Sequence, residues 1–396
     1  MSRRETLRTR AFVFAWLAHL LHGISFNSYL HLPGFLRDRG ATEFEIGLLF
    51  GGGAVAGIVV KPLVGREIDR AGPRPVILAA GALAALGCCG YVAVARNAAP
   101  VPWMYFMRVV QAASMASLFT ALYAHTAEIL PVSRRIEGIG IFGVSGVLSI
   151  GLGGVLGDVL LRAGDYRSLF VASAIASSLA FALSIPLRRS RRAPEGVKGR
   201  FVVVLIQREM FPLWFAAVLL ASMVATYSTF LKTYVQSTGA GSVGLFFSVY
   251  SGAAIVVRMV FGAVPERAGP KRVLYPALAC MALGFLVLAH TCSAWGVAAA
   301  GLLYGVGQGY AFPILIGLAV ARAKSDQRGS TLAVFTSFFD AGTLVGSPLF
   351  GLVVRARGYS VMFASAGVVL VAAMVLFAQW ERAVLPSSTN TRKGIS

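Results

Sequence analysis

Long apolar stretches alternate with short polar breaks along the whole chain. Twelve of these stretches approach or exceed the roughly 20 residues that an α-helix needs to cross the hydrocarbon core of a bilayer. Their approximate bounds are 11–32, 44–64, 75–95, 101–127, 136–160, 166–187, 211–236, 243–264, 273–291, 296–321, 330–354 and 359–380. Lipid offers the backbone no hydrogen-bond partners, so each stretch is predicted to be a helix. We therefore expect an all-α integral membrane protein with 12 transmembrane helices.

Composition agrees with this pattern, because 57% of the 396 residues are hydrophobic and soluble domains contain fewer. The chain opens with MSRRETLRTR, and no small-residue cleavage site ends the apolar run that follows. We interpret that run as a retained first span and not as a signal peptide. The four cysteines have no metal-ligand spacing, so they are expected to be apolar filler, and neither a metal nor a cofactor is expected.

The formal net charge of +20 raises the possibility of a nucleic-acid partner, and the positions of the basic residues decide against it. With the amino terminus taken as cytoplasmic, the cytoplasmic connections hold 25 of the 36 lysines and arginines, and the opposite connections hold 7. This is the positive-inside bias of membrane proteins. We expect a multi-pass protein of the cell membrane, in bacteria the inner membrane, surrounded by lipid, with both termini cytoplasmic and no nucleic-acid partner.

The chain is predicted to consist of two related halves. Residues 47–77 and 244–274 align at an offset of 197 with 13 of 31 positions identical, and Lys61 falls on Arg258. The charged stretch RRSRRAPEGVKGR lies between the sixth and seventh spans. We expect an amino-terminal half over 1–187, a cytoplasmic linker over 188–210 and a carboxyl-terminal half with a short cytoplasmic tail over 211–396. Parallel six-span repeats are typical of transporters that work by alternating access.

Three motifs carry a resemblance to a known family. The pattern Gly65-x3-Asp69-Arg70-x-Gly72-x-Arg74 follows the second span and recurs in weaker form after the eighth, and RVVQA begins at Arg108 in the fourth. Spans ten and eleven read GQGYAFPILIGLAVARAKSDQRGSTLAVFTSFFDAGTLVGSPLFG. The chain resembles the major facilitator superfamily, in particular its 12-span bacterial small-molecule and drug efflux permeases. The resemblance implies two pseudo-symmetric six-helix halves and secondary active transport.

The repeated loop is predicted to be a turn that latches the two halves together. Gly72 permits a positive φ for a tight reversal, and Pro73 fixes the next φ. In the family, the acid of this loop faces the start of helix eleven and its arginine pairs with an acid that ends helix four, here Glu128. The predicted gating residues are Gly65, Asp69, Arg70, Gly72, Arg74 and Glu128 in the first copy and Gly262, Glu266, Arg267, Gly269 and Arg272 in the second, which faces Glu137.

Glycines recur in the second, fifth and eleventh spans, often at intervals of four. Examples are Gly47 and Gly51, Gly153 and Gly157, and the pair Gly342 and Gly346. Small residues at this spacing let membrane helices approach closely and slide. Glycine is also common in membrane helices generally, so the pattern supports close helix contacts without specifying them.

Polar residues inside the spans are the candidates for substrate binding, since the resemblance implies that helices one, four, seven and ten line a central cavity. The candidates are His19, His22, Asn27, Arg108, Gln111, Tyr227, Lys232, Tyr304 and Gln308. Charges at membrane depth are expensive and rarely idle, so Arg108 is the strongest of these. Lys232 lies near the end of its span, where its long side chain could instead reach the interface.

Two features are candidates for proton coupling. Asp340 is the one acid near the middle of a predicted span, and it either exchanges protons or makes a structural hydrogen bond. His19 and His22 share a helix face. They could relay protons, bind a metal with further ligands, or be ordinary hydrogen-bonded residues.

We predict a proton-coupled carrier that exports a small molecule and works as a monomer; the alternative is proton-coupled uptake of an organic anion or zwitterion. Efflux members of the family usually carry Gly-Pro in helix five, where this chain has Gly153-Gly154. An integral-membrane enzyme is disfavoured, because no metal-binding acid cluster or nucleophile with its base is visible inside the spans. ATP-driven transport is disfavoured by the absence of a Gly-x4-Gly-Lys-Ser/Thr loop.

Overall fold

The computed structural model describes residues 9–96, 101–131, 134–187, 201–324 and 327–384, and in this part of the chain all regular structure is helical. Nine helices of the described part are long and apolar enough to cross a membrane. One of them, α14 (Arg328–Val384), contains two spans that meet at Gly358, whose φ of 82° is not helical. The break lies between the predicted spans 330–354 and 359–380, so the all-helical membrane fold is confirmed.

The first span is divided into three short elements, and the other predicted spans each form one long helix or half of α14. In the amino-terminal half the elements are α1 (Arg10–Ser28), η1 (Tyr29–His31), α2 (Leu32–Asp38), α3 (Glu43–Ala71), α4 (Pro73–Arg96), α5 (Val101–Ile129), α6 (Arg135–Ala163) and α7 (Tyr166–Ser184). In the carboxyl-terminal half they are α8 (Phe201–Leu205), η3 (Arg208–Met210), α9 (Phe211–Thr238), α10 (Val243–Val260), α11 (Val264–Ala268), α12 (Pro270–His290), α13 (Ala294–Arg322) and α14. The part of the predicted linker over 188–200 lies outside the described residues.

The two copies of the repeated loop have different structures. In the first copy, α3 continues through Arg70 to Ala71, so residues 65–71 are helical and not the turn that the sequence predicts. In the second copy, α10 ends at Val260 and the short helix α11 follows, with Pro265 in its first turn. A proline is tolerated there because its missing N–H has no partner in a first turn. The reversals themselves fall at Gly72 and Gly269, whose φ values of 81° and 95° confirm the positive φ predicted for Gly72.

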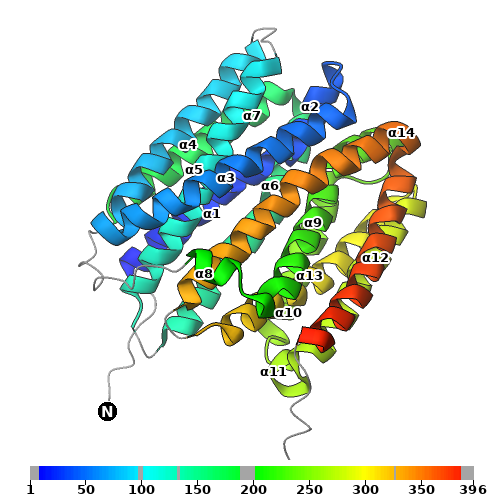
Figure 1. Ribbon diagram of the computed structural model, residues 1–396. Helices are drawn as coiled ribbons and strands as arrows, with labels where there is room; N and C mark the ends of the chain where they lie inside the picture. The colour runs from blue at the N-terminus through cyan, green and yellow to red at the C-terminus, as the bar shows by residue number, and fades with distance from the viewer. Residues whose placement is uncertain (1–8, 97–100, 132–133, 188–200, 325–326, 385–396) are drawn as a thin grey trace, which may run out of the picture.

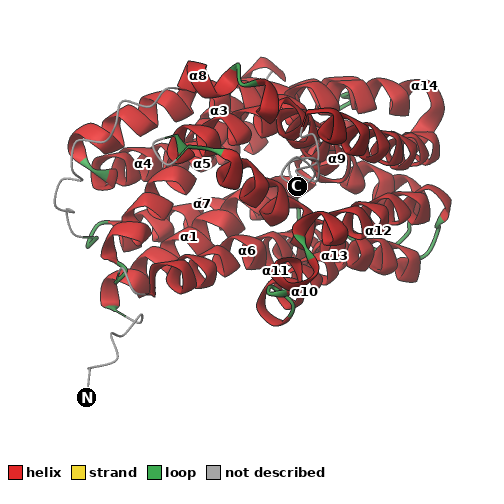
Figure 2. Cartoon of the chain, turned by 60° about the horizontal axis from the view of Figure 1, so that its bottom comes forward, coloured by secondary structure: helices red, strands yellow, loops and turns green. Residues whose placement is uncertain are grey.

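The helices form two bundles that lie side by side (Figure 1). In the first bundle α1 packs on α6 and α7, and α4 packs on α5 and α7; in the second, α12 packs on α13 and α14. The main contacts between the bundles are made by α3 with α14 and by α6 with α10. Figure 2 shows the same helices from the end at which α1 begins. We call the contact of α3 with α14 the α3–α14 interface and the contact of α6 with α10 the α6–α10 interface.

The two ends of the bundles are named by their residues. The linker end carries the start of α1, Ala71, Leu187 and the end of α14, and the distal end carries Asp38, Glu43 and Gly358. If the positive-inside assignment is right, the linker end is cytoplasmic. A hydrophobic cluster around Phe230, Phe246 and Phe285 fills the carboxyl-terminal half, and two smaller clusters fill the amino-terminal half.

Candidate functional site: the contacts between the two halves

Glycines bring the two halves together near the distal end. A Cβ on Gly154 would lie 3.3 Å from the Cα of Gly244, and one on Gly47 would lie 2.5 Å from the backbone oxygen of Ser347. Such distances leave no room for a side chain, so backbone packs on backbone at both interfaces. Gly342 and Gly346 contact Val218 and Ser222 in the same way, and they join α14 to α9 within one half. These contacts confirm that the glycine pattern marks close helix packing.

Contacts between the halves become fewer toward the linker end. Among the described residues, the side-chain hydrogen bonds between α3 and α14 that lie nearest the linker end join Lys61 to Asp340 and Thr336. Arg70, close to the end of α3, is 83% exposed. In the described part of the chain, the close contacts between the halves thus gather at the distal end and the middle of the interfaces.

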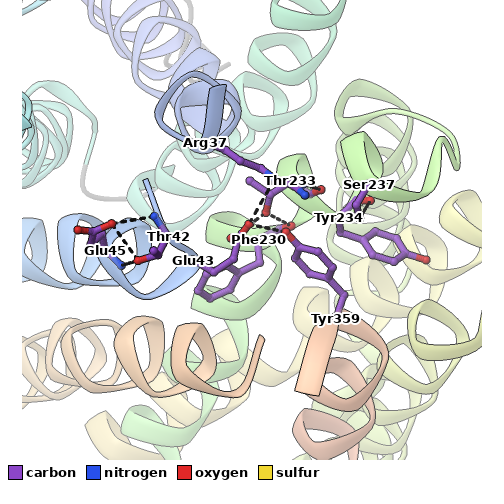
Figure 3. A network of polar contacts seen from close by, with 9 residues as sticks. All are labelled: Arg37, Thr42, Glu43, Glu45, Phe230, Thr233, Tyr234, Ser237 and Tyr359. Carbon is purple, nitrogen blue, oxygen red and sulfur yellow. Dashed lines mark hydrogen bonds and ion pairs between the residues drawn. The ribbon is translucent and has the colours of Figure 1, made fainter. Parts of the chain in front are cut away.

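At the distal end, a polar network joins four elements of the two halves (Figure 3). Glu43, the first residue of α3, accepts a 2.5 Å hydrogen bond from the Tyr359 hydroxyl and a 3.1 Å hydrogen bond from the Thr233 hydroxyl. Arg37 of α2 donates a 2.7 Å hydrogen bond to the Thr233 carbonyl oxygen. Because Thr233 and Tyr359 belong to the second half, this distal network holds α2 and α3 against α9 and α14.

A second distal contact closes the α6–α10 interface. Asp158 of α6 is 2.9 Å from Nε2 of His31, and its other carboxylate oxygen accepts a 2.7 Å hydrogen bond from the backbone N–H of Gly244. The Gly244 amide is in the first turn of α10, where N–H groups have no partner inside the helix and favour a negative charge. Asp158 therefore caps a helix of the opposite half.

A charged pair crosses the α3–α14 interface farther from the distal end. Nζ of Lys61 lies 2.5 Å from Oδ2 of Asp340 and donates a 3.2 Å hydrogen bond to the Thr336 carbonyl oxygen. Both side chains of the charged pair are partly buried. Asp340 also lies against α3, because a Cβ on Gly57 would be 3.0 Å from its Oδ2. The candidate proton site is thus part of an ion pair between the halves, and Lys61 is a partner that sequence reasoning did not assign to it.

Arg108 lies inside the amino-terminal half. It is 8% exposed, its Nη1 donates a 2.7 Å hydrogen bond to Gln111, and its guanidinium lies over the rings of Phe50 and Phe26 at 4.2 and 5.3 Å. Its Nε and the Gln111 amide nitrogen have no hydrogen-bond partner among the described residues. The structure thus brings Arg108 and Gln111 together and gives the guanidinium cation–π contacts.

The other candidates of the first half lie on α1. His19 makes a 2.7 Å hydrogen bond with Ser145, and the Asn27 amide donates to the Gly23 carbonyl oxygen and the Ser149 hydroxyl. Neither ring nitrogen of buried His22 has a hydrogen-bond partner in the described part of the chain. No group of three or more metal-ligating side chains occurs among the described residues. His19 therefore has a partner for one of its ring nitrogens and none for Nε2 among the described residues, and the roles of both histidines stay predictions.

The candidates of the second half form a cluster of tyrosines. Tyr227 and Tyr250 both donate to the Gln308 side-chain oxygen, at 2.8 and 2.5 Å, and the ring of Tyr304 lies 4.3 Å from that of Tyr227. Lys232 stands apart from this cluster. Its side chain lies against Gly34 of α2, near the distal end. The structure therefore brings Tyr227, Tyr304 and Gln308 together and places Lys232 at a contact between the halves.

Among the side chains that the structure describes, the predicted latch residues do not meet one another in this conformation. Arg70 is 3.8 Å from Glu67, and Arg74 donates to the carbonyl oxygens of Leu187 and Ile185 at the end of α7. Glu128 keeps one buried carboxylate oxygen without a hydrogen-bond partner among the described residues. In the second copy Glu266, Arg267 and Arg272 are exposed. The side chains of Asp69 and Glu137 lie outside the described part of the structure, so the latch stays a prediction.

Sequence reasoning missed most of the contacts between the halves. Glu43, Arg37 and His31 lie at the ends of apolar spans, where charged residues usually face solvent. A signal existed for Lys61, because a lone acid deep in a membrane span needs a compensating cation. A further ion cluster at the linker end joins buried Glu381 to Arg322 and to Lys271, the latter at 2.6 Å; it lies within the second half.

Two bundles of membrane helices that meet along glycine-lined interfaces are an architecture typical of secondary transporters. The family comparison agrees: the model of the Major Facilitator Superfamily matches residues 15–292 and 213–395, so the chain belongs to this family. It is a multi-pass membrane transporter. The resemblance drawn from the repeated loop is confirmed.

Curated relatives and solved structures support the same assignment. The chain is 25% identical over 365 residues to YhhS of Escherichia coli K12, an uncharacterized MFS-type transporter, covering 87% of this chain and 86% of that protein. The fold is similar to that of the nucleoside transporter NupG, with a TM-score of 0.76, 14% identity and 95% and 100% of the two chains covered. It is also similar to the human organic anion transporter MFSD10, with a TM-score of 0.68, 15% identity and 93% and 99% covered.

Proposed function

We propose that this chain exports a small molecule across the bacterial inner membrane in exchange for protons, with the linker end in the cytoplasm. The observation that carries the proposal is the charged pair of Lys61 and Asp340. It joins the two halves, and it lies near the mid-depth of α3 and α14 instead of in the solvent-exposed loops. A carboxylate in this position links proton binding to the relative position of the halves.

The linkage follows from what the pair does in each charge state. An ionised Asp340 attracts the Lys61 ammonium across the α3–α14 interface and favours the conformation that is closed at the distal end. A proton on Asp340 removes the attraction and leaves a single cation in the interface, which disfavours the same conformation. Since a ligand shifts a conformational equilibrium by its difference in affinity for the two states, a proton that binds Asp340 would favour opening at the distal end.

Two observations bear on direction and substrate. The resemblance of spans ten and eleven to efflux permeases favours export. Buried Arg108, which has no described carboxylate within 4.0 Å, favours an anionic or zwitterionic substrate, and MFSD10 is described as an organic anion transporter. Proton-coupled uptake of an organic anion is therefore the second candidate, and it uses the same Asp340. We propose Arg108 and Gln111 as substrate-binding residues, with His19, His22, Asn27, Tyr227, Lys232, Tyr304 and Gln308 as further candidates.

The first experiment is a comparison of a deletion strain with its parent during growth on a panel of toxic compounds and by metabolite profiling. Export predicts that the deletion strain is more sensitive to the substrate and accumulates it. Uptake predicts that the deletion strain is more resistant and depleted of it. The two candidate functions therefore give opposite results for one compound.

The coupling is then tested in everted membrane vesicles with an imposed pH gradient. Export by antiport predicts that the substrate accumulates in vesicles that are acidic inside, and that collapse of the gradient releases it. The Asp340→Asn variant should be expressed normally and lose this response to the gradient. A variant that still accumulates substrate in response to the gradient would remove Asp340 from the mechanism.

A further inference from the structure

Each of the two interfaces between the halves carries a basic residue, and the interfaces differ in whether that residue has an acidic partner. At the offset of 197 that relates the two halves, Arg258 of α10 corresponds to Lys61, and Gly143 of α6 corresponds to Asp340. Lys61 is neutralised by Asp340 across the α3–α14 interface. The α6–α10 interface has the cation but a glycine in place of the acid. The duplication has therefore left one basic residue without its counterpart.

Arg258 lies on the face of α10 that is turned toward the other half. Gly244, Ser251 and Arg258 recur every seven residues, so they share one side of the helix. The first two of them contact α6, since a Cβ on Gly151 would lie 3.1 Å from the Ser251 hydroxyl. Seven residues correspond to about 10 Å along a helix. Arg258 therefore lies roughly that far beyond the last of these contacts, toward the linker end.

The guanidinium of Arg258 has no acceptor in the described part of the chain. It donates no hydrogen bond to a described residue and is within 4.0 Å of no described carboxylate, and its Nε is buried without a partner. The side chain as a whole is partly exposed. Buried polar groups in native proteins nearly always have a partner. An unpartnered Nε beside accessible N–H groups is the arrangement expected of a site that receives an anion.

Aromatic side chains of the first half lie at the α6 position that corresponds to Asp340. A Cβ on Gly143 of α6 would lie 3.3 Å from the hydroxyl of Tyr123 in α5. The Tyr123 ring lies 4.6 Å from that of Phe119, one turn earlier on the same helix, and Phe119 is 43% exposed. An acidic group bound at Arg258 would therefore have an accessible aromatic surface of the other half next to it.

We propose that Arg258 forms an anion-binding subsite between the halves for aromatic organic acids, with the acidic group on the guanidinium and the ring on Phe119 and Tyr123. This subsite rests on the proposal that the chain carries a small molecule, and it is independent of direction and of proton coupling. A planar guanidinium binds a carboxylate through two parallel hydrogen bonds, which a lysine ammonium cannot reproduce. Because the anion joins residues of both halves, its binding also favours their approach at the linker end.

The test is equilibrium binding of 1-naphthoate to the purified full-length protein in detergent, followed by thermal shift and by quenching of tryptophan fluorescence. The neutral amide 1-naphthamide has the same shape without the charge. Wild-type protein should bind the acid and not the amide. Arg258→Gln should weaken binding of the acid by at least about tenfold, and Arg258→Lys should recover only part of the loss.

Two further variants separate the parts of the subsite. Phe119→Ala should weaken binding of naphthoate several-fold while the preference for acid over amide remains. Lys324→Gln removes an exposed cation near the linker end and should bind as the wild type does. Failure of the wild type to bind naphthoate, equal binding of acid and amide, or unchanged binding by Arg258→Gln would each overturn the proposal. None of these outcomes affects the vesicle test of Asp340, so failure of the subsite and failure of the proposed function are distinguishable.

Discussion

The α3–α14 interface and the α6–α10 interface descend from the same sequence and hold the halves together by different means. At the α3–α14 interface, charged and polar side chains act at two levels, the distal network around Glu43 and the pair of Lys61 and Asp340. At the α6–α10 interface, backbone packs on backbone at Gly154 and Gly244, and Asp158 caps α10. Both interfaces have close glycine contacts, but among the described residues only the α3–α14 interface adds an ion pair away from the distal end.

This difference assigns separate tasks to the two interfaces. Charge can be changed by a proton, so the α3–α14 interface is able to respond to pH. Glycine packing does not itself respond to protons and tolerates sliding and rocking of helices, so we expect the glycine contacts of the α6–α10 interface to act as a bearing on which the halves move. The duplication thus supplied two equivalent contacts, and substitutions at a few positions made them unequal.

The largest effect is expected from removing the close approach at the bearing. A Cβ at position 244 would lie 2.5 Å from Oδ2 of Asp158 and 2.9 Å from the Cα of Val155. Gly244→Val should therefore force the halves apart at the distal end, lower the unfolding midpoint and reduce transport at least about tenfold, since overpacking costs about 1–3 kcal/mol. Gly252→Val, on the same helix with no atom within 4 Å, is the matched control. Equal losses in both variants would show that helix propensity and not packing is responsible.

The next effect concerns the charged pair and is measured by a double-mutant cycle. Lys61→Met leaves the Asp340 carboxylate without its cation, and this should cost about 2 kcal/mol of unfolding free energy. The double variant Lys61→Met/Asp340→Asn removes both charges and should regain a large part of that stability. Chemical denaturation in detergent measures all four proteins. Additive losses in the double variant would mean that the two groups are not coupled.

Much of the architecture could be predicted from the sequence, because apolar length and backbone satisfaction in lipid leave only helices. The predicted spans 330–354 and 359–380 meet at Gly358, and Gly72 has the positive φ that the turn requires. The continuation of α3 to Ala71 was not predicted, because charged residues in a short connection are typical of turns. A helix that extends beyond the membrane into water can carry the same charges, and the pattern does not distinguish the two.

The site was less predictable, because its contacts join residues far apart in the chain. Asp340 was a candidate from its depth alone, but its partner is 279 positions away. Glu43 and Tyr359 are at opposite ends of the chain and have no local signal that pairs them. The repeat offered one clue, since it aligned Lys61 with Arg258, and only the structure shows which of the two cations is neutralised.

A smaller effect is expected from the distal network, which has several partly redundant hydrogen bonds. Tyr359→Phe removes one donor to Glu43 and leaves the hydrogen bond from Thr233 to Glu43 and that from Arg37 to the Thr233 carbonyl oxygen in place. The loss of one charge-assisted hydrogen bond, about 1–2 kcal/mol, should increase opening of the distal end several-fold, measured as faster hydrogen exchange in the first turns of α3. Tyr105→Phe removes a hydroxyl that bonds within one half, to the Glu45 carbonyl oxygen. Faster exchange in that variant as well would contradict a specific role for the contact between the halves.

The smallest effect on stability is expected at Arg70, where a substitution should change the rate of transport without changing the stability of the fold. In the present conformation Arg70 is 83% exposed, and its ion-pair partner among the described residues is Glu67. Arg70→Gln should therefore leave the unfolding midpoint unchanged, as expected for an exposed ion pair. If the latch forms when the linker end closes, the same variant should slow transport several-fold. Arg66→Gln, an exposed cation on the same helix, controls for lost charge. A residue that stabilises only the conformation closed at the linker end must change the rate of transport. Equal transport rates in both variants would therefore contradict a role for Arg70 in the latch.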